Sequence, residues 1–254
     1  MRRPVWALAL GFATALSMSS VHANEADYVN PDPLEGFNRA MYTFNDTLDG
    51  VLLKPLATAY HALPDPIEKG VGNFFSNLGD PLNALNNLLQ GKFDVAVNDL
   101  MRFVINTTIG IGGIFDVASE AQMAKSDEDF GQTLAVWGVD SGPYLVLPFF
   151  GPSTIRDAAG LGVEKLVLAE QEVGNTQVFD LVQEVGNSDD RILIRTTDVV
   201  DTRAQLFDTE KVLDSAALDE YTFVRDSWLQ RRENQVYDGN PPLAPPPDFL
   251  RISD

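Results

Sequence analysis

Apolar residues recur three and four positions apart along most of this chain, which is the spacing of one face of an α-helix. The clearest stripe begins just after Asp32 and Pro33, residues that suit a helix cap and a first-turn position. A stripe of this kind most often packs against a protein core, and it predicts an amphipathic helix. Its apolar members are Phe37, Met41, Phe44, Leu48, Val51 and Leu52.

Two further helices are predicted in tandem. Asp80 and Pro81 resemble a cap followed by a first-turn proline, leucines from 82 to 89 form the stripe, and Gly91 ends it. The next stripe covers residues 93–104, so a tight turn would place the two helices antiparallel.

Later segments repeat the helical pattern. Thr154 to Asp157 resembles a capping box, with Asp in place of the usual Glu, and helical spacing returns from about residue 164 to 232. Few segments alternate in the manner of strands. The expected fold class is therefore all-α.

Two segments are unusually apolar for surface loops. From Phe103 to Phe115 the only residues that are neither apolar nor glycine are Asn106, Thr107 and Thr108. Residues 134–150 carry one charge, Asp140, among aromatic residues, glycines and prolines.

The two ends of the chain predict processing and an extended tail. A cleavable secretory signal peptide is predicted over 1–23. Its typical features are Arg2 and Arg3, the apolar run that follows them and the small residues up to Ala23. This run is shorter than the roughly 20 apolar residues that span a membrane. A linker over 24–31 follows, and 233–254 is a proline-rich tail. We expect export to the periplasm of a bacterium.

Charge and cysteine content exclude several classes of function. The chain has 18 basic against 37 acidic residues, which disfavours binding to nucleic acid or to anionic headgroups through a basic patch. There is no cysteine, so disulfides, thiolate chemistry and lipidation at a cysteine are excluded. Contact with a membrane would have to be apolar.

The sequence offers little support for catalysis. His61 alone remains after the signal peptide, and no Gly-x-Ser-x-Gly elbow accompanies it. Phe115 occupies the place of the third glycine of a dinucleotide loop. We expect no enzyme, no cofactor and no metal, since the following acidic residues match no calcium loop: Asp198, Asp201, Asp208 and Glu210.

The run DPLEGFNRAMYTFN at 32–45 resembles the opening signature of the MlaA/VacJ proteins, outer-membrane components of a Gram-negative phospholipid-transport pathway. Further similar motifs follow in the same order, so the resemblance covers 32–232. They include NNLLQG at 86–91, GIGGIFDVA at 110–118, DFGQTL at 129–134 and GPST at 151–154. Each motif alone is weak, and their order makes them specific.

The resemblance implies a ring-shaped single helical domain with an amphipathic central channel, lying in the inner leaflet of the outer membrane beside a trimeric porin. Phospholipids that have strayed into the outer leaflet would enter the channel and pass to a soluble periplasmic carrier, which maintains lipid asymmetry. Members of the family usually carry a lipidated cysteine after the signal peptide, and this chain departs from them there.

Residue roles follow from the resemblance alone. Phe37 with the amides of Asn38, Asn45 and Asn106 is expected to line the channel, and a hairpin around Asp140, Ser141 and Gly142 to gate it. Family members often have a second glycine where this chain has Asp140 and Ser141, which weakens a flexible gate. Gly110, Gly112 and Gly113 are expected either in a helix-terminating turn or in a membrane-depth or channel role.

Two other classes remain open from the sequence. One is a periplasmic helical scaffold or assembly factor that binds protein, which would be soluble and lipid-free. The other is a lipid-remodelling hydrolase, which would depend on His61.

Overall fold

The protein is described here from a computed structural model, which describes residues 32–169 and 188–242. In these ranges the chain is helical apart from one short antiparallel hairpin, which confirms the all-α fold class. The elements are α2 Glu35–Leu48, η1 Asp49–Leu53 (a π-helical turn), α3 Lys54–His61, α4 Asp65–Leu89, α5 Phe93–Thr108, α6 Val117–Glu120, α7 Phe130–Val136, β1 Tyr144–Leu147, β2 Gly151–Thr154, α8 Ile155–Ala169, α9 Ser188–Ala204, α10 Phe207–Ala216 and α11 Glu220–Val236.

Two predicted helix starts are wrong. Leu34 occupies the N-cap position of α2, while the buried Asp32 carboxylate accepts hydrogen bonds from Asn38 and Tyr221. Asp80 does not cap a helix either, because α4 runs unbroken through Pro81. The Asp80 carboxylate is fully buried and accepts a hydrogen bond from Lys125 Nζ at 2.6 Å, a contact that holds it inside the fold.

Two other local predictions are confirmed. Gly91 has a φ of +80°, the left-handed conformation that glycine adopts readily, and it ends the helix before the turn to α5. Thr154 caps α8 in the predicted way, since its hydroxyl accepts from the Asp157 N–H at 3.2 Å and donates to the Asp157 carboxylate at 2.8 Å.

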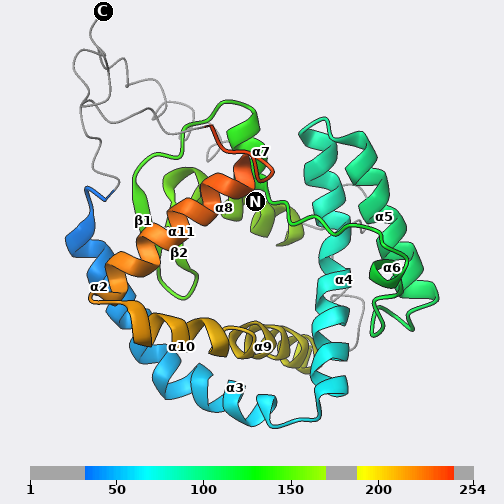
Figure 1. The fold of residues 1–254 in the computed structure, drawn as a ribbon, viewed down its shortest axis with the longest axis horizontal. Coiled ribbons are helices and arrows are strands. Elements are labelled where there is room, and N and C mark those ends of the chain that lie inside the picture. The colour runs from blue at the N-terminus through cyan, green and yellow to red at the C-terminus, as the bar shows by residue number, and fades with distance from the viewer. Residues whose placement is uncertain (1–31, 170–187, 243–254) are drawn as a thin grey trace, which may run out of the picture. The chain divides into compact units, whose positions relative to one another are not determined.

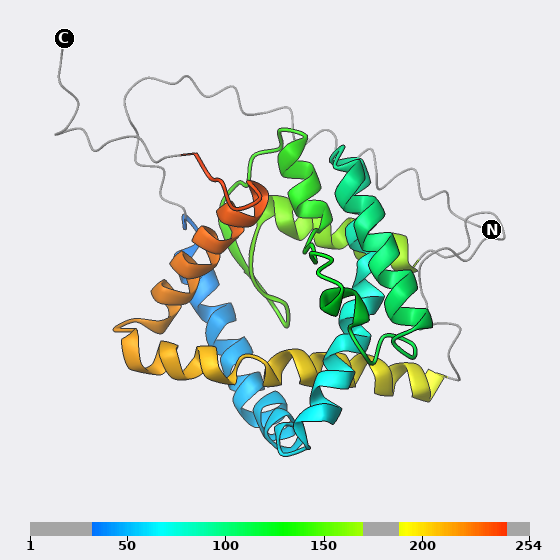
Figure 2. The same ribbon diagram turned by 45° about the vertical axis from the view of Figure 1, so that its right-hand side comes forward.

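Packing contacts link the described elements into a closed circuit (Figures 1 and 2). From α2 the chain continues through η1 to α3, α3 packs on α9, α9 on α4, and α4 on α7. Helix α7 packs on α8 and α11, α11 contacts β2, and β1 packs on α2. Helix α5 packs outside this circuit along α4. Both views show the β1–β2 hairpin turning toward the middle of the circuit.

The predicted signal peptide and linker lie outside the described residues. Helix α11 continues to Val236, past the boundary at 232 that was expected for the helical domain.

Buried apolar side chains are few. Ala57, Val200 and Ala204 form one cluster, and Tyr144, Val146 and Tyr221 form another. The second cluster joins the hairpin to α11, and Met41 and Trp228 pack against it. Much of the remaining interior of the described residues is polar, and many large apolar side chains are left on the surface.

Candidate functional site

Helix α5 has its polar face inside and its apolar face outside. Asp99 and Arg102 are 0% and 1% exposed, whereas Phe93 and Val97 are 67% and 58% exposed. A helix of a water-soluble protein buries its apolar stripe instead. The outer face of α5 is therefore suited to contact with an apolar medium.

Arg102 and Asn106, which are buried on α5, pair with groups of the segment 116–123. The Arg102 guanidinium donates to the Met123 carbonyl at 2.5 Å, to the Asp116 carboxylate at 3.1 Å and to Ser119. Asn106 donates to Asp116 at 2.9 Å and accepts from the Ala118 N–H at 2.9 Å. These bonds satisfy groups whose burial would otherwise cost several kcal/mol, and of the Arg102 guanidinium only the buried Nε has no hydrogen-bond partner among the described residues.

Burial and pairing compete at the carboxylates of this interior. At Asp116, burial favours the neutral form, but hydrogen bonds from Ser119 and Asn106 and the charge of Arg102 outweigh it, so the pKa falls to about 2. At Asp80, burial is the larger effect and raises the pKa although Lys125 opposes it.

Large apolar side chains are exposed over much of the described surface. Four members of the stripe over α2 and η1, Phe37, Phe44, Val51 and Leu52, are among them, so the expectation that the stripe packs on a core is wrong for these four, whereas Met41 packs against the Tyr144 cluster. Soluble monomers rarely expose contiguous apolar area on this scale. Examples with more than half of their surface exposed are Val51, Ile67, Phe93, Val97, Ile109, Ile111, Phe115, Trp137, Phe149 and Phe150.

Asn38 and Asn45 bind the free edge of β1. The Asn38 amide donates to the Tyr144 carbonyl at 3.0 Å and accepts from the Val146 N–H at 2.9 Å. The Asn45 amide donates to the Leu147 carbonyl at 2.9 Å and accepts from the Phe149 N–H at 2.8 Å. Both amides therefore fix the hairpin on α2.

The other predicted site residues lie in separate places. Phe37, on α2, is about half exposed. Asn106 is buried beside Asp116, where its amide is already bonded. A lining role for these residues stays a prediction.

Gly110, Gly112 and Gly113 lie in a tight turn after α5. A Cβ on Gly110 would lie 2.1 Å from the Phe115 carbonyl oxygen, and one on Gly113 would lie 2.7 Å from Asn77. Gly112 has open space around it but a φ of +70°. The turn ends helix α5, which agrees with the first of the two expectations for these glycines. It also leaves the apolar side chains of Ile109, Ile111 and Phe115 exposed.

Asp140, Ser141 and Gly142 precede the hairpin. Its strands pair Tyr144 with Thr154 and Leu147 with Gly151, so its turn lies at 148–150. The 140–142 segment is at the opposite, open end, where the Ser141 carbonyl accepts from the Arg156 N–H at 3.1 Å. The resemblance implied a hairpin around residues 140–142, whereas the turn of the hairpin lies at 148–150.

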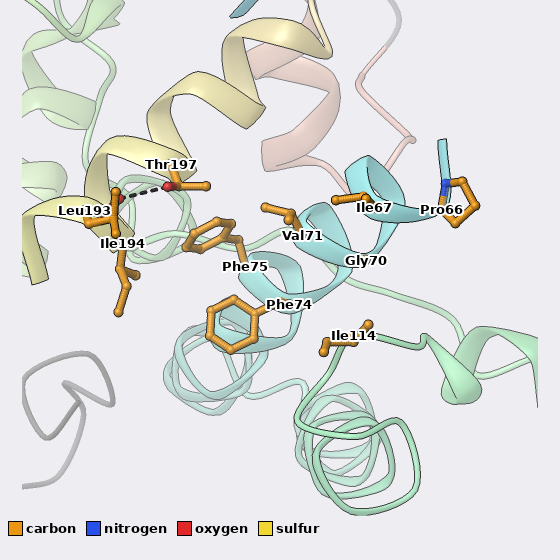
Figure 3. A pocket seen from close by; sticks show the side chains of 10 residues that line it. All are labelled: Pro66, Ile67, Gly70, Val71, Phe74, Phe75, Ile114, Leu193, Ile194 and Thr197. Carbon is orange, nitrogen blue, oxygen red and sulfur yellow. Dashed lines mark hydrogen bonds between the residues drawn. The ribbon is translucent and has the colours of Figure 1, made fainter. Parts of the chain in front are cut away.

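An apolar groove of about 550 Å³ lies between the first half of α4 and α9 (Figure 3). Phe74 and Phe75 of α4 face Leu193 and Ile194 of α9, and Ile114 from the turn after α5 closes another side. Thr197 is the one hydroxyl in the lining, and it donates to the Leu193 carbonyl at 2.9 Å. The groove offers a ligand apolar contact and little else.

No site among the described residues brings together the side chains of a catalytic centre or of a metal centre. His61 is exposed, with Nδ1 3.0 Å from Glu68. Among the described residues no three His, Cys, Asp or Glu side chains are grouped to hold a metal ion. No helix within 32–169 or 188–242 is long and apolar enough to cross a membrane.

The family model described as "MlaA lipoprotein" matches residues 30–235. The chain belongs to this family. An Escherichia coli relative named "Intermembrane phospholipid transport system lipoprotein MlaA" is 34% identical over 238 residues, covering 92% of this chain and 88% of the relative. A Haemophilus influenzae protein of the same name is 32% identical, covering 82% of this chain and 80% of the relative. A Rickettsia typhi protein is 35% identical over 206 residues, covering 81% of this chain and 78% of that protein.

A solved structure has the same fold as this MlaA-family chain. It is reported as "Structural basis for maintenance of bacterial outer membrane lipid asymmetry", with a TM-score of 0.65 and 33% identity over 82% of this chain and 99% of that one. The recognised motifs thus identified the family correctly. The α4–α9 groove was missed, because its walls lie far apart in the sequence and only the apolar spacing of Ile67, Val71 and Phe74 hinted at one side.

Proposed function

We propose that this protein is the outer-membrane component of an intermembrane phospholipid transport system, held at the periplasmic side of that membrane. It takes phospholipids misplaced in the outer leaflet and passes them to a soluble periplasmic carrier, with a trimeric porin as its neighbour in the membrane. The names of its relatives support this, and so does the exposed apolar surface over a paired polar interior.

The α4–α9 groove supplies a place for a lipid tail. A tail must move without meeting water, and burial stabilises each methylene by about 0.8 kcal/mol. The groove walls are apolar on both helices, while the far side of the α4–α9 crossing is polar, around Asp201, Gln205 and Asn73. Tail and headgroup thus find different surfaces on the same pair of helices.

The hairpin is the element we propose as the gate. Phe149 and Phe150 at its turn are 71% and 61% exposed, and Phe149 meets Phe44 of α2 edge to face with ring centres 5.5 Å apart. Asn38, buried, anchors the start of β1, while the more exposed Asn45 holds the turn. Breaking the Asn45 bonds would release the turn and leave the strand in place.

The first test is expression of the full chain in a Gram-negative host that lacks its own MlaA, followed by separation of soluble periplasm from outer membrane. We expect the protein in the outer membrane with bound phospholipid, and fewer surface phospholipids accessible to a membrane-impermeant amine reagent. Soluble, lipid-free recovery with unchanged surface lipid would overturn the proposal in favour of a periplasmic scaffold.

A further inference from the structure

A polar cavity of about 340 Å³ lies between the segment that precedes α7, strand β2, α8 and α11, and no ligand-binding role has been given to its lining above. Its volume lies within the range of small-molecule sites, about 300 to 1,000 Å³. Four carboxylates and two guanidinium groups line it, together with Trp228, Ser153 and Leu161. The charged members are Asp127, Asp129, Asp157, Glu164, Arg231 and Arg232.

Carboxylates dominate the inner end of the cavity. Arg232 donates to Asp129 at 2.6 Å and to Asp157 at 2.9 Å, and Asp157 also pairs with Arg156 at 3.1 Å, so these two carboxylates are matched by two guanidinium groups. Glu164 accepts from the Phe130 N–H at 2.6 Å, and no basic side chain of the described residues forms an ion pair with it. Burial accordingly raises the pKa of Glu164. A cationic ligand would supply the missing charge.

A positive charge lies at the outer end. The Arg231 side chain is 73% exposed and lies 4.0 Å from Asp127, too far for a firm pair. Deeper in, Arg232 is 8% exposed, and its buried Nε has no hydrogen-bond partner in the described part of the chain. The outer end of the cavity therefore presents the Arg231 guanidinium beside the exposed Asp127 carboxylate, and the part-buried Glu164 carboxylate lies deeper than Arg231.

We propose that this cavity binds the headgroup of a phospholipid carrying a primary ammonium, with the ammonium against Glu164 and the phosphate against Arg231. When such a lipid enters with its tails outside, its ammonium goes in first and its phosphate follows. This order matches Glu164, which lies deeper in the cavity, and Arg231, which lies at its outer end. This inference rests on the proposed function and adds the headgroup class to it.

The lining also selects among headgroups. A primary ammonium has three N–H donors for carboxylate oxygens, whereas a trimethylammonium has none. A glycerol headgroup leaves the phosphate charge unbalanced beside four carboxylates and only two guanidinium groups. Phosphatidylethanolamine is the common lipid that meets both conditions.

The test loads the purified full chain in nanodiscs that contain equal amounts of phosphatidylethanolamine, phosphatidylcholine and phosphatidylglycerol, and bound lipid is then extracted and counted by mass spectrometry. The native chain should retain phosphatidylethanolamine about tenfold over the other two, which is the effect of roughly 1.4 kcal/mol. Glu164→Gln should abolish the preference, because it removes the charge but keeps an oxygen for the Phe130 N–H. Glu120→Gln, exposed on α6, is the matched control and should keep it.

A second variant tests the phosphate end. Arg231→Gln changes an exposed side chain and should lower retention of phosphatidylethanolamine and phosphatidylglycerol alike. Bound phospholipid without headgroup preference in the native chain, or a preference that survives Glu164→Gln, would overturn this inference and leave the proposed function standing. Absence of bound phospholipid from the native chain would overturn both.

Free headgroup distinguishes the source of the ligand. Phosphoethanolamine, added during the loading experiment, should compete with phosphatidylethanolamine in the native chain. If calorimetry detects Glu164-dependent binding of phosphoethanolamine while the lipid preference is absent, the ligand is the free molecule and the headgroup assignment is overturned.

Discussion

Asn38 and Asn45 lie two helical turns apart on α2, and each makes to β1 the pair of hydrogen bonds that a neighbouring strand would make. Only a carboxamide places a donor and an acceptor side by side in this way. An aspartate would lose the donor, and an apolar residue would lose both. The strand edge of β1 therefore explains why both positions are asparagine.

Replacement of Asn38 by Leu should lower the free energy of unfolding by roughly 2 to 4 kcal/mol, because buried partners on Tyr144, Val146 and Asp32 lose their bonds. Denaturant unfolding followed by circular dichroism measures this loss. The control is Asn234→Leu on the exposed surface of α11. Equal stability of the two variants would contradict the role given to Asn38.

Asp116 predicts a dependence of stability on pH. Its folded pKa of about 2 is below the unfolded value near 4, so the folded state holds the proton less tightly. The stability it contributes is present above pH 4 and is lost as the pH falls through 4 toward 2. Asp116→Asn removes this contribution.

The gap in unfolding free energy between the native chain and Asp116→Asn should therefore narrow as the pH falls from about 5 to 2. Urea titrations at each pH measure it, with Asp94→Asn on the surface of α5 as the control. A gap that stays constant over this range would show that Asp116 is not ionised in the paired form.

At the scale of single residues, the resemblance pointed to Asn38 and Asn45 as lining residues, and their bonds to the hairpin were not predicted. The Tyr144 carbonyl that Asn38 binds lies 106 positions away, so no local pattern could report this contact. Asp80 was misread because a buried aspartate before a proline has the same letters as a helix cap. Lys125, its partner, comes 45 residues later, and local patterns carry no information about it.

At the scale of elements, periodicity located the helices but not the side they bury. The apolar stripes on α2 and α5 were identified correctly, yet most of their large side chains are exposed. A helical period reports that one face is apolar, and it is silent on whether that face meets protein or lipid. The π-helical turn η1 was not predicted either, and neither was the contact of its first residue, Asp49, with Arg203 of the distant helix α9 at 2.7 and 2.9 Å.

The α4–α9 groove predicts a difference between two neighbouring residues of α9. Leu193 and Ile192 are both 65% exposed, but only Leu193 lines the groove. A charge at 193 would face the place assigned to a lipid tail. Leu193→Glu should therefore lower co-purifying phospholipid several-fold, while Ile192→Glu should retain it.

Bound lipid is measured per mole of protein in detergent, so that any change in membrane attachment does not enter the comparison. Circular dichroism confirms that both variants fold. Equal lipid content in the two variants would remove the groove from the transport path.

At the scale of the whole described unit, the chain is arranged like a protein that sits in lipid. Its fully buried side chains include Asp80, Asp99 and Arg102, and its exposed ones include Phe93 and Phe115. These buried side chains are tolerated because each is hydrogen-bonded or ion-paired, whereas the apolar exterior is stable only where water is excluded. The family could be inferred from ordered motifs, but this arrangement needed coordinates, because burial depends on contacts between distant segments.

The outer face of α5 then predicts how the protein is retained at the membrane. Phe93 and Val97 lie one helical turn apart and are 67% and 58% exposed. Moving both side chains from water into lipid contributes about 3 kcal/mol, which is roughly a hundredfold in the partition of the protein between membrane and water.

The double variant Phe93→Ser/Val97→Ser should shift from the outer-membrane pellet to the soluble periplasm, while Gln230→Ser/Glu233→Ser on the polar surface of α11 should not. Immunoblots of the two fractions at equal expression measure the shift. Since neither pair is buried, unfolding is not expected in either variant, and full retention of the α5 variant would mean that α5 does not face lipid.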